Sequence, residues 1–240
     1  MNERARQELT STGALRVGIN LGNTLLVSDR AQNGTPVGVA PDFAKAIADA
    51  LDVAVSYTSF DRVGDVADAI TAGTVDIGLI AIEEERAKTI SFSPHYCEIE
   101  ATYLVPANSA IQAIEDVDRP GVRIAVSNRA AYDLYLSRTL KHAELVRAQG
   151  LQAAAEMFVH EKLDALAGLR LALLENAQTI PEMHVLESKY TTVEQAIGTQ
   201  PKNEAATEFL VGFVSTAKKS GLITKLIERH GQTGRLMVAG

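Results

Sequence analysis

Short apolar runs alternate with amphipathic stretches along almost the whole chain, and this alternation is the feature that most constrains the fold. Ile77–Ile82 is a continuous apolar run after Asp76, a pattern typical of a strand buried on both faces of a parallel sheet. Asp42–Leu51 and Val63–Ala72 carry apolar residues at helical spacing, and Gly73 supplies a left-handed end to the second. Strand–helix–strand alternation of this kind predicts an α/β fold with right-handed crossovers.

The alternation forms two series. The first adds strands at Ala14–Ile19 and Val53–Tyr57 to the elements above. The second comprises strands at Val122–Ser127, Glu144–Val146, Leu163–Ala167 and His184–Leu186, and helices at Ala130–Thr139, Leu151–His160 and Leu169–Gln178. The chain then ends in two helices, Ala206–Ala217 and Leu222–Ile227, each with a one-sided apolar stripe. Two β-prone stretches, Ala101–Val105 and Val193–Gly198, lie between these blocks and are interpreted as paired crossovers between two lobes.

The charge balance limits the partners. The 240 residues include 23 basic and 30 acidic side chains, which gives a formal net charge of −7, and they contain no basic block. These features argue against nucleic acid or an anionic membrane as the main partner. A small anionic ligand is still compatible with them, because a pocket needs only one or two well-placed cations.

The sequence gives no indication of a metal or a cofactor. Cys97 is the only cysteine, so an intrachain disulfide and a multi-cysteine metal site are impossible. The histidines are scattered without metal-ligand spacing; they are His95, His142, His160, His184 and His230. There is no Gly–x–Gly–x–x–Gly pattern and no Walker loop. We therefore expect neither a metal nor a cofactor.

The start of the chain carries charges at Glu3, Arg4, Arg6 and Glu8 and has no apolar core, so it does not read as an uncleaved signal peptide. No stretch of about eighteen uncharged apolar residues occurs anywhere, so no transmembrane span is expected. Either the protein stays in the cytoplasm or a leader has been removed, and both alternatives remain open at this point.

The stretch EEERAKTISFSPHY, from Glu83 to Tyr96, resembles the signature of the bacterial solute-binding proteins that deliver polar amino acids and related solutes to ABC importers. In that family an arginine-bearing turn is followed by a short strand and a Phe–Ser–x–Pro–Tyr pattern. Other stretches agree in order with the family; they are Gly38–Leu51, Ile70–Ile82, Val117–Leu136 and Ala217–Gly231. The ordered co-occurrence covers about nine-tenths of the chain and is more specific than any one motif.

The resemblance implies an α/β, two-lobed type II periplasmic-binding-protein fold. Each lobe would be a mixed, mostly parallel sheet flanked by helices, and two crossover strands would join the lobes. Lobe 1 would comprise residues 1–104 plus 195–240, and lobe 2 residues 105–194. The resemblance also implies that the lobes close on a solute by hinge motion.

Arg86 is the first candidate for ligand binding. In amino-acid-binding relatives the matching arginine forms a bidentate pair with the ligand carboxylate, a geometry that suits a guanidinium. The alternative is a surface arginine paired with Glu83, Glu84 or Glu85 in the same turn, where ion pairs are worth under about 1 kcal/mol.

Other pocket positions depart from the amino-acid-binding pattern. Relatives place a hydroxyl where this chain has Ala81, and a Gly–Ser/Thr–Thr turn where it has Asn128–Ala131. They place an aspartate for the α-ammonium about where Leu169 stands. An unpaired ammonium in a desolvated cleft costs several kcal/mol, which makes a standard α-amino acid a poor candidate. Ala81, Ala130 and Ala131 stay candidate contacts by position.

Two further arginines could bind an anion. Arg129 lies at a predicted helix N-terminus, where backbone N–H groups favour negative charge. Arg170 follows the predicted strand Leu163–Ala167. For both, the alternative is a solvated or salt-bridged arginine.

Weaker candidates follow the predicted strands. Asn20 and Asn23 lie at the carboxyl edge of the first strand, where they could contact a polar group or build an Asx turn. Ser127 ends a strand of the second series, and Tyr103 lies in a crossover, where core or hinge packing is the alternative.

The sequence therefore predicts a monomeric, non-enzymatic binding protein for a small carboxylate-containing solute, with an ABC transporter permease as a partner. The resemblance implies a periplasmic or exported location, and the chain's own start leaves the cytoplasm as an alternative. Two other functions stay open: a cyclohexadienyl-dehydratase-like enzyme on the same scaffold, with Glu83 and Glu194 as its acid and base, or a soluble sensor without a transporter.

Overall fold

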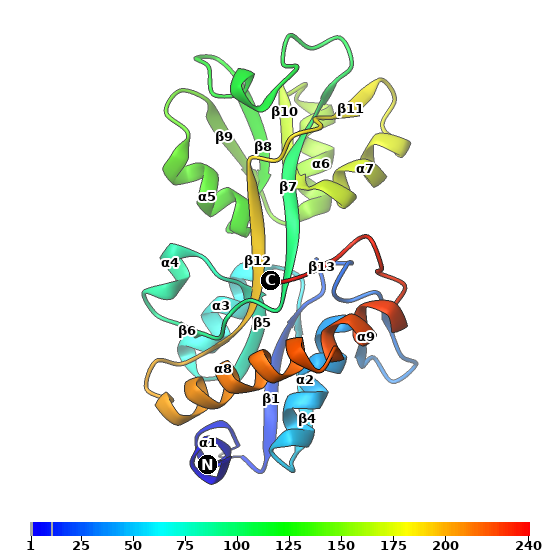
Figure 1. Ribbon diagram of the computed structural model, residues 1–240. Helices are drawn as coiled ribbons and strands as arrows, with labels where there is room; N and C mark the ends of the chain where they lie inside the picture. Colours follow the sequence, from blue (N-terminus) through cyan, green and yellow to red (C-terminus); the bar gives the residue numbers. More distant parts are fainter. Residues whose placement is uncertain (1, 11) are drawn as a thin grey trace. The chain divides into compact units, whose positions relative to one another are not determined.

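The computed structural model describes residues 2–10 and 12–240 (Figure 1). Two compact units are present. Unit 1 contains the described residues up to Glu98 together with Glu194–Gly240, and unit 2 contains Ile99–Val193. The chain crosses between the units within two strands, β7 (Cys97–Pro106) and β12 (Thr191–Thr199). Both stretches interpreted as crossovers lie inside these strands, so the α/β fold with two connecting strands is confirmed.

The sheet of unit 1 is mixed. Strand β1 (Ala14–Asn20) pairs in parallel with β4 (Ala54–Phe60) and with β5 (Ile77–Ala81). Strand β12 pairs antiparallel with β5, which gives the order β4-β1-β5-β12. Every residue of β5 is buried, as the continuous apolar run predicted.

Helices α2 (Val39–Ala50) and α3 (Val63–Ala72) pack against this sheet; α2 contacts β1 and β4, and α3 contacts β1 and β5. The close approach of α3 requires a glycine in β5, because a Cβ on Gly78 would lie 2.6 Å from Cδ1 of Ile70. Gly73 ends α3 with φ 70°, the left-handed conformation that glycine adopts without strain. The bounds of α3 match the prediction at both ends.

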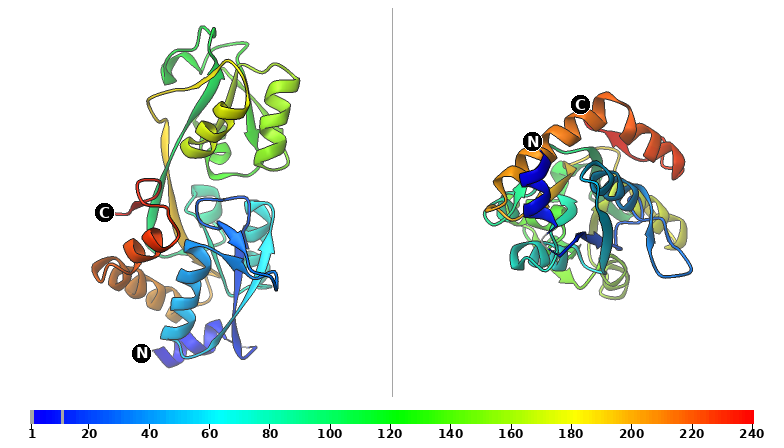
Figure 2. Two further views of the ribbon diagram at one scale, coloured as in Figure 1. Left: turned by 90° about the vertical axis from the view of Figure 1, so that its right-hand side faces the viewer. Right: turned by 90° about the horizontal axis from the view of Figure 1, so that it is seen from below.

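Further helices of unit 1 are α1 (Asn2–Leu9), the one-turn α4 (Glu84–Ala87), α8 (Glu204–Lys219) and α9 (Leu222–Arg229). Helix α1 packs against α8 (Figure 2), and the backbone N–H of Ala206 donates to Glu8 Oε2 at 2.9 Å. No helix was predicted over α1, because its short amphipathic pattern gains its stability from this contact with α8.

Four short strands complete unit 1. A two-stranded hairpin is formed by β2 (Asp29–Arg30) and β3 (Pro36–Val37). Strand β6 (Ser91–Phe92) pairs with β12, and β13 (Met237–Val238) pairs with the first residues of β7.

Unit 2 repeats the α/β pattern. Strand β8 (Arg123–Ser127) pairs in parallel with β9 (Glu144–Ala148) and β10 (Ala165–Leu169), and β7 pairs antiparallel with β10 and with β11 (Met183–Val185). The helices are α5 (Ala131–Thr139), α6 (Leu151–His160) and α7 (Arg170–Thr179), with a 3₁₀ turn at Ile114–Asp116. Phe158 and Leu166 belong to the core cluster between β8, β10 and α6.

Several element boundaries differ from the prediction, and two of the differences have a clear local reason. Helix α2 begins at Val39 and not after Pro41, because a proline in the first turn lacks only an N–H that has no intrahelical partner there. Strand β10 begins at Ala165 and not at Leu163. Asp164, just before it, uses its side chain to accept a hydrogen bond from the backbone N–H of Arg123 at 2.7 Å.

Within the described residues, no helix is long and apolar enough to cross a membrane. The same part of the chain holds no cluster of three His, Cys, Asp or Glu side chains that could bind a metal ion. Cys97 is buried, and burial raises the pKa of its thiol above the ordinary range.

Candidate functional site

The parallel strands of unit 1 end at Asn20, Phe60 and Ala81, and these carboxyl ends share one edge of the sheet. Open α/β sheets bind ligands at that edge. The segment that follows β5 at this edge holds α4, and α4 carries Arg86.

Arg86 is 6% exposed. Its Nη1 donates to the backbone carbonyl of Ala81 at 2.8 Å, which holds the guanidinium at the carboxyl end of β5. Its own carbonyl accepts from the N–H groups of Thr89 and Ile90, which closes the turn after α4. At this exposure Arg86 is not a surface arginine, and a buried guanidinium needs polar partners that satisfy its N–H groups.

The segment after Arg86 is fixed onto β12. The N–H of Ser93 donates to the carbonyl of Ile197, and the N–H of Ile197 donates back to Ser93 Oγ at 3.1 Å. The Tyr96 ring lies 4.8 Å from the ring of Phe43 and is fully buried. The Phe–Ser–Pro–x–Tyr segment Phe92–Tyr96 thus builds the frame that positions the arginine turn.

Asn20 and Asn23 have different surroundings. Asn20 Oδ1 accepts from the N–H of Gly22 at 3.1 Å, which is the Asx-turn alternative. Asn23 is 8% exposed, and its carbonyl accepts from the N–H groups of Leu26 and Val27. The side-chain Oδ1 of Asn23 is buried and receives no hydrogen bond. Asn23 therefore keeps an available acceptor at the carboxyl edge of β1.

A hollow of about 540 Å³ lies beside this loop in unit 1. Its polar lining residues are Ser28, Asp29, Arg30 and Asp61. Sequence analysis missed these residues. The hairpin β2–β3 that carries Asp29 and Arg30 has strands of only two residues each, and their pairing gives no periodic signal. Asp61 directly follows β4, and that position was the one signal that could have found it.

In unit 2, Arg129 precedes α5 in the left-handed conformation, with φ 61°. Its backbone N–H donates to Asp133 Oδ2 at 2.8 Å, while Asp133 Oδ1 accepts from Arg147 Nε at 2.9 Å. The Arg129 side chain is exposed. Ser127, Ala130 and Ala131 are buried around the same turn at the N-terminus of α5.

Arg170 is held by three acceptors inside unit 2. Its Nε donates to Glu100 Oε2 at 2.7 Å, and its Nη1 and Nη2 donate to the carbonyls of Leu186 and Glu187 at 2.9 and 2.8 Å. The hydrogen bond from Arg170 is the main reason that the pKa of Glu100 is lowered. These contacts favour the salt-bridged alternative for Arg170.

Tyr103 lies in the core of unit 2, where it is 1% exposed and its ring centroid is 4.5 Å from that of Tyr190. Burial raises the pKa of its hydroxyl above the ordinary range. This environment fits the packing alternative for Tyr103.

Of the two carboxylates considered for an enzyme, Glu83 follows β5 and Glu194 lies within the neighbouring strand β12. Gln195 of β12 pairs with Ala81 of β5, and the N–H of Ile82 donates to the carbonyl of Glu194. Glu83, one residue further on, is buried. Glu194 Oε2 lies 3.7 Å from Nδ1 of His95. Local sequence patterns do not indicate that Glu83 lies near Glu194, because the antiparallel pairing of β5 and β12 joins segments more than 100 residues apart.

The two α/β units and their two connecting strands define the class of type II periplasmic binding proteins. Residues 15–233 match the bacterial extracellular solute-binding proteins, family 3, and the chain belongs to this family. Membership implies a small-molecule ligand and an ABC transporter as partner. The family is typically extracellular or periplasmic.

Solved structures with the same fold share little sequence. A mutant of ArgBP from T. maritima is 23% identical, with 94% of this chain and 98% of that chain covered and a TM-score of 0.77. An ancestral amino acid-binding protein, a precursor of cyclohexadienyl dehydratase, is 24% identical, with 94% and 98% covered and a TM-score of 0.77. The cysteine-binding protein of Campylobacter jejuni is 14% identical, with both chains fully covered and a TM-score of 0.80. No curated protein sequence matches the chain.

Proposed function

We propose that this protein captures a small carboxylate-containing solute through the Arg86 guanidinium and delivers it to an ABC importer. The observation that carries the proposal is the burial of Arg86 at the carboxyl end of β5, anchored on the carbonyl of Ala81, in a member of a solute-binding family. A guanidinium fixed in this way suits bidentate recognition of a carboxylate. Similar structures include proteins described as bound to arginine or lysine, and both of these ligands carry a carboxylate.

The turn at the N-terminus of α5 contributes the second part of the site in this proposal. The N–H group of Ala131 in the first turn of α5 and the exposed side chain of Arg129 favour negative charge there. The protein works as a monomer outside the cytoplasmic membrane. Its two units close on the solute by hinge motion. Contacts that the solute makes only in the closed state supply the free energy for closure.

The ligand in this proposal is not a standard α-amino acid. Leu169 ends β10, where relatives carry an aspartate for the α-ammonium. Two acidic side chains of unit 2 are already paired with arginines: Glu100, next to that strand end, with Arg170, and Asp133 with Arg147. An ammonium left without a carboxylate in a desolvated site costs several kcal/mol, so a solute without that group is favoured.

The test begins with mass spectrometry of the small molecules that co-purify with the protein, followed by calorimetric titration of each candidate. Arg86→Ala is expected to abolish binding, and Arg86→Lys to recover a small part of it. Arg62→Ala is the matched control, because Arg62 is a half-exposed arginine of unit 1 that pairs with Asp65. Affinity that survives Arg86→Ala, or nanomolar binding of glutamine or histidine, would contradict the proposal.

A second candidate function is a dehydratase on the same scaffold. The observation that favours it is the placement of Glu83 just after β5 and of Glu194 within the adjacent strand β12, with His95 beside Glu194. Carboxylates in such a position can act as general acid and base. The test is loss of prephenate or arogenate during incubation, with Glu83→Gln as the variant. Consumption that depends on Glu83 supports the enzyme, and intact substrate excludes it.

A further inference from the structure

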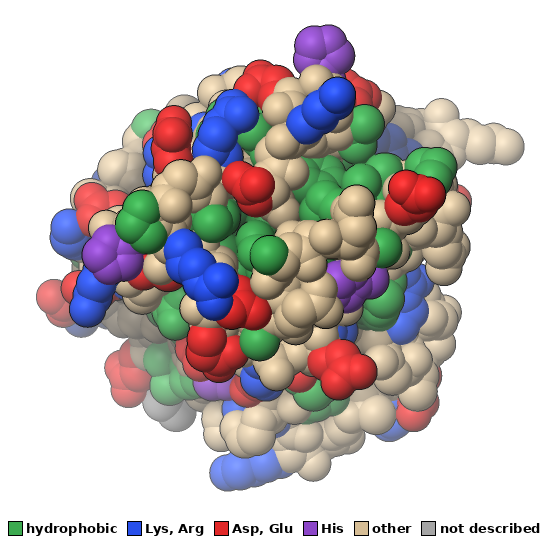
Figure 3. All heavy atoms as spheres, turned by 90° about the horizontal axis from the view of Figure 1, so that it is seen from above, with side chains coloured by type: hydrophobic (Ala, Val, Ile, Leu, Met, Phe, Trp, Pro, Cys, Tyr) green, Lys and Arg blue, Asp and Glu red, His purple; other side chains and the backbone are tan. Residues whose placement is uncertain are grey.

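A second cavity lies in unit 2, at the opposite edge of its sheet from Ser127 and Leu169. It has a volume of about 470 Å³, which is in the range of small-molecule sites. Its walls come from the amino ends of β8 and β10, the end of β7 and the end of α6. Seen from this end of unit 2, hydrophobic side chains are exposed in a hollow among acidic and basic ones (Figure 3).

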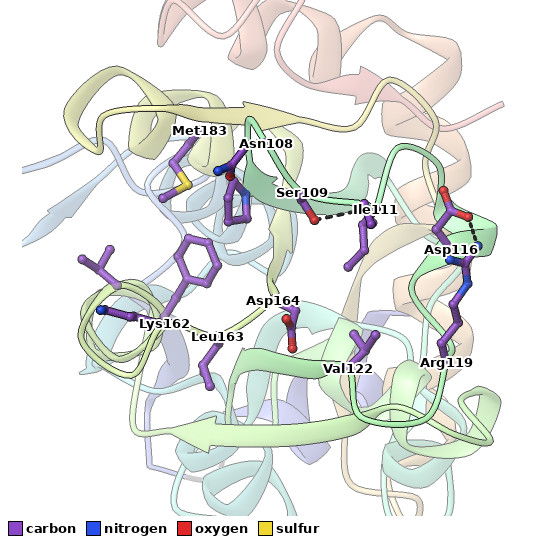
Figure 4. Close-up of a pocket in the computed structure, with 14 residues that line it drawn as sticks. Asn108, Ser109, Ile111, Asp116, Arg119, Val122, Lys162, Leu163, Asp164 and Met183 are labelled. Atoms are coloured by element: carbon purple, nitrogen blue, oxygen red, sulfur yellow. Dashed lines mark hydrogen bonds and ion pairs between the residues drawn. The ribbon is translucent and has the colours of Figure 1, made fainter.

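The floor of this cavity is apolar. Phe158 and Leu163 belong to the core of unit 2, and each is almost fully buried. Val122 and Met183 add partly exposed apolar surface on two sides (Figure 4). An apolar group of a ligand would therefore gain mainly by covering the partly exposed surface of Val122 and Met183, which removes apolar area from water.

The carboxylate of Asp164 lies at this floor and can accept a further hydrogen bond. Asp164 Oδ2 accepts from the N–H of Arg123 at 2.7 Å, which fixes the carboxylate. No other described residue donates to the Asp164 carboxylate, so its Oδ1 has no protein partner. Figure 4 shows this side chain between Leu163 and Val122. A half-buried carboxylate with one open oxygen attracts a cationic donor more strongly than an exposed one does.

The basic groups at the rim do not cancel this preference. Arg119 is paired with Asp116 through its Nη2 (Figure 4). Lys162 is exposed, so water screens its ammonium from the floor of the cavity. A ligand that carried a carboxylate would be repelled, because its negative charge would face the open oxygen of Asp164.

We propose that this cavity binds a small organic ammonium with an apolar body. The body covers the partly exposed Val122 and Met183, and the ammonium donates to Asp164 Oδ1. The site is at the other edge of the sheet from the turn of Arg129–Ala131, so it is separate from the solute site proposed above and does not depend on it. The net charge of −7 of the whole chain adds long-range attraction for a cation.

The test titrates the full-length, ¹⁵N-labelled protein with three probes of one shape: hexylammonium, 1-hexanol and hexanoate. We expect hexylammonium to shift the amide signals of Ile111, Leu163 and Asp164 and to bind roughly tenfold more tightly than 1-hexanol, the ratio that one charge-assisted hydrogen bond supplies. Hexanoate should bind more weakly than both. This comparison uses only the unmodified protein, so it remains decisive if a variant fails to fold.

Asp164→Asn is expected to remove the preference for hexylammonium over 1-hexanol, because its amide oxygen can still accept from Arg123 while the charge is lost. Glu156→Gln is the matched control, since Glu156 lies on α6 and bonds Gln152 on the surface. Equal binding of the three probes would show hydrophobic contact alone and overturn the proposal. So would a preference that survives Asp164→Asn, or signal shifts confined to other parts of the chain.

Discussion

The carboxyl edges of the two sheets place their arginines in different settings. In unit 1, Arg86 is buried in a one-turn helix and anchored on the carbonyl of Ala81. In unit 2, Arg170 is tied to Glu100 and two carbonyls, and Arg147 is tied to Asp133. Arg170 and Arg147 of unit 2 therefore hold segments of the fold together. The comparison shows that an arginine after a strand becomes a binding candidate through its partners and its burial, and not through its position in sequence alone.

The sharpest test of this difference compares Arg86→Ala with Arg170→Ala. Removal of Arg86 is expected to lower affinity for the cognate solute more than 100-fold, because a charged hydrogen-bonding group costs about 3 kcal/mol or more when it is lost from a buried pair. Removal of Arg170 should change affinity less than about threefold but lower the stability of unit 2. Affinity is measured by calorimetry and stability by urea unfolding. A larger affinity loss for Arg170→Ala would reverse the assignment of the two side chains.

Asp133→Ala tests whether the acidic groups of unit 2 serve its fold. Asp133 is buried and accepts from Arg147 Nε and from the N–H of Arg129. Loss of both bonds should reduce the free energy of unfolding by about 2–3 kcal/mol, as measured by urea denaturation. Asp65→Ala, which breaks a pair with the half-exposed Arg62, is the control and should cost less than about 1 kcal/mol. Equal losses in the two variants would refute a structural role for Asp133.

Much of the fold could be predicted because local patterns and tertiary packing agree. The helix Val63–Ala72 was predicted at both ends, since its apolar face and Gly73 act within one segment. The strands β2, β3 and β13 were missed, because two-residue strands exist only through their pairing partners. Helix α1 was missed for the same reason, since α8 stabilises it from the other end of the chain.

The candidate site could be predicted less completely. Arg86 was found because its motif is local, but three glutamates before it gave no indication of its burial. The partners of Arg170 lie in β7 and in the segment after β11, and Glu100 is 70 residues away in sequence. The open acceptor of Asn23 and the charged lining at Asp29 and Asp61 depend on how loops fold over the sheet edge. Such contacts are set by tertiary packing, and sequence spacing does not encode them.

The pH dependence of stability gives the smallest effect, and it tests whether the Arg170–Glu100 pair stabilises the fold of unit 2. Arg170 and Lys189 hold the pKa of Glu100 below its ordinary value of about 4.3. A lowered pKa in the folded state contributes stability that is fully present above the unfolded value and is lost as the pH falls through the folded one. Because Glu100 is about one-third exposed, the contribution is under about 1 kcal/mol. Urea unfolding between pH 6 and pH 3 should therefore show that the free energy of unfolding falls more steeply for the parent protein than for Glu100→Gln. The variant lacks most of this contribution at every pH. Glu144→Gln, an exposed strand residue of unit 2, should keep the parent slope; parallel curves for all three proteins would mean that the Arg170–Glu100 pair contributes no net stability.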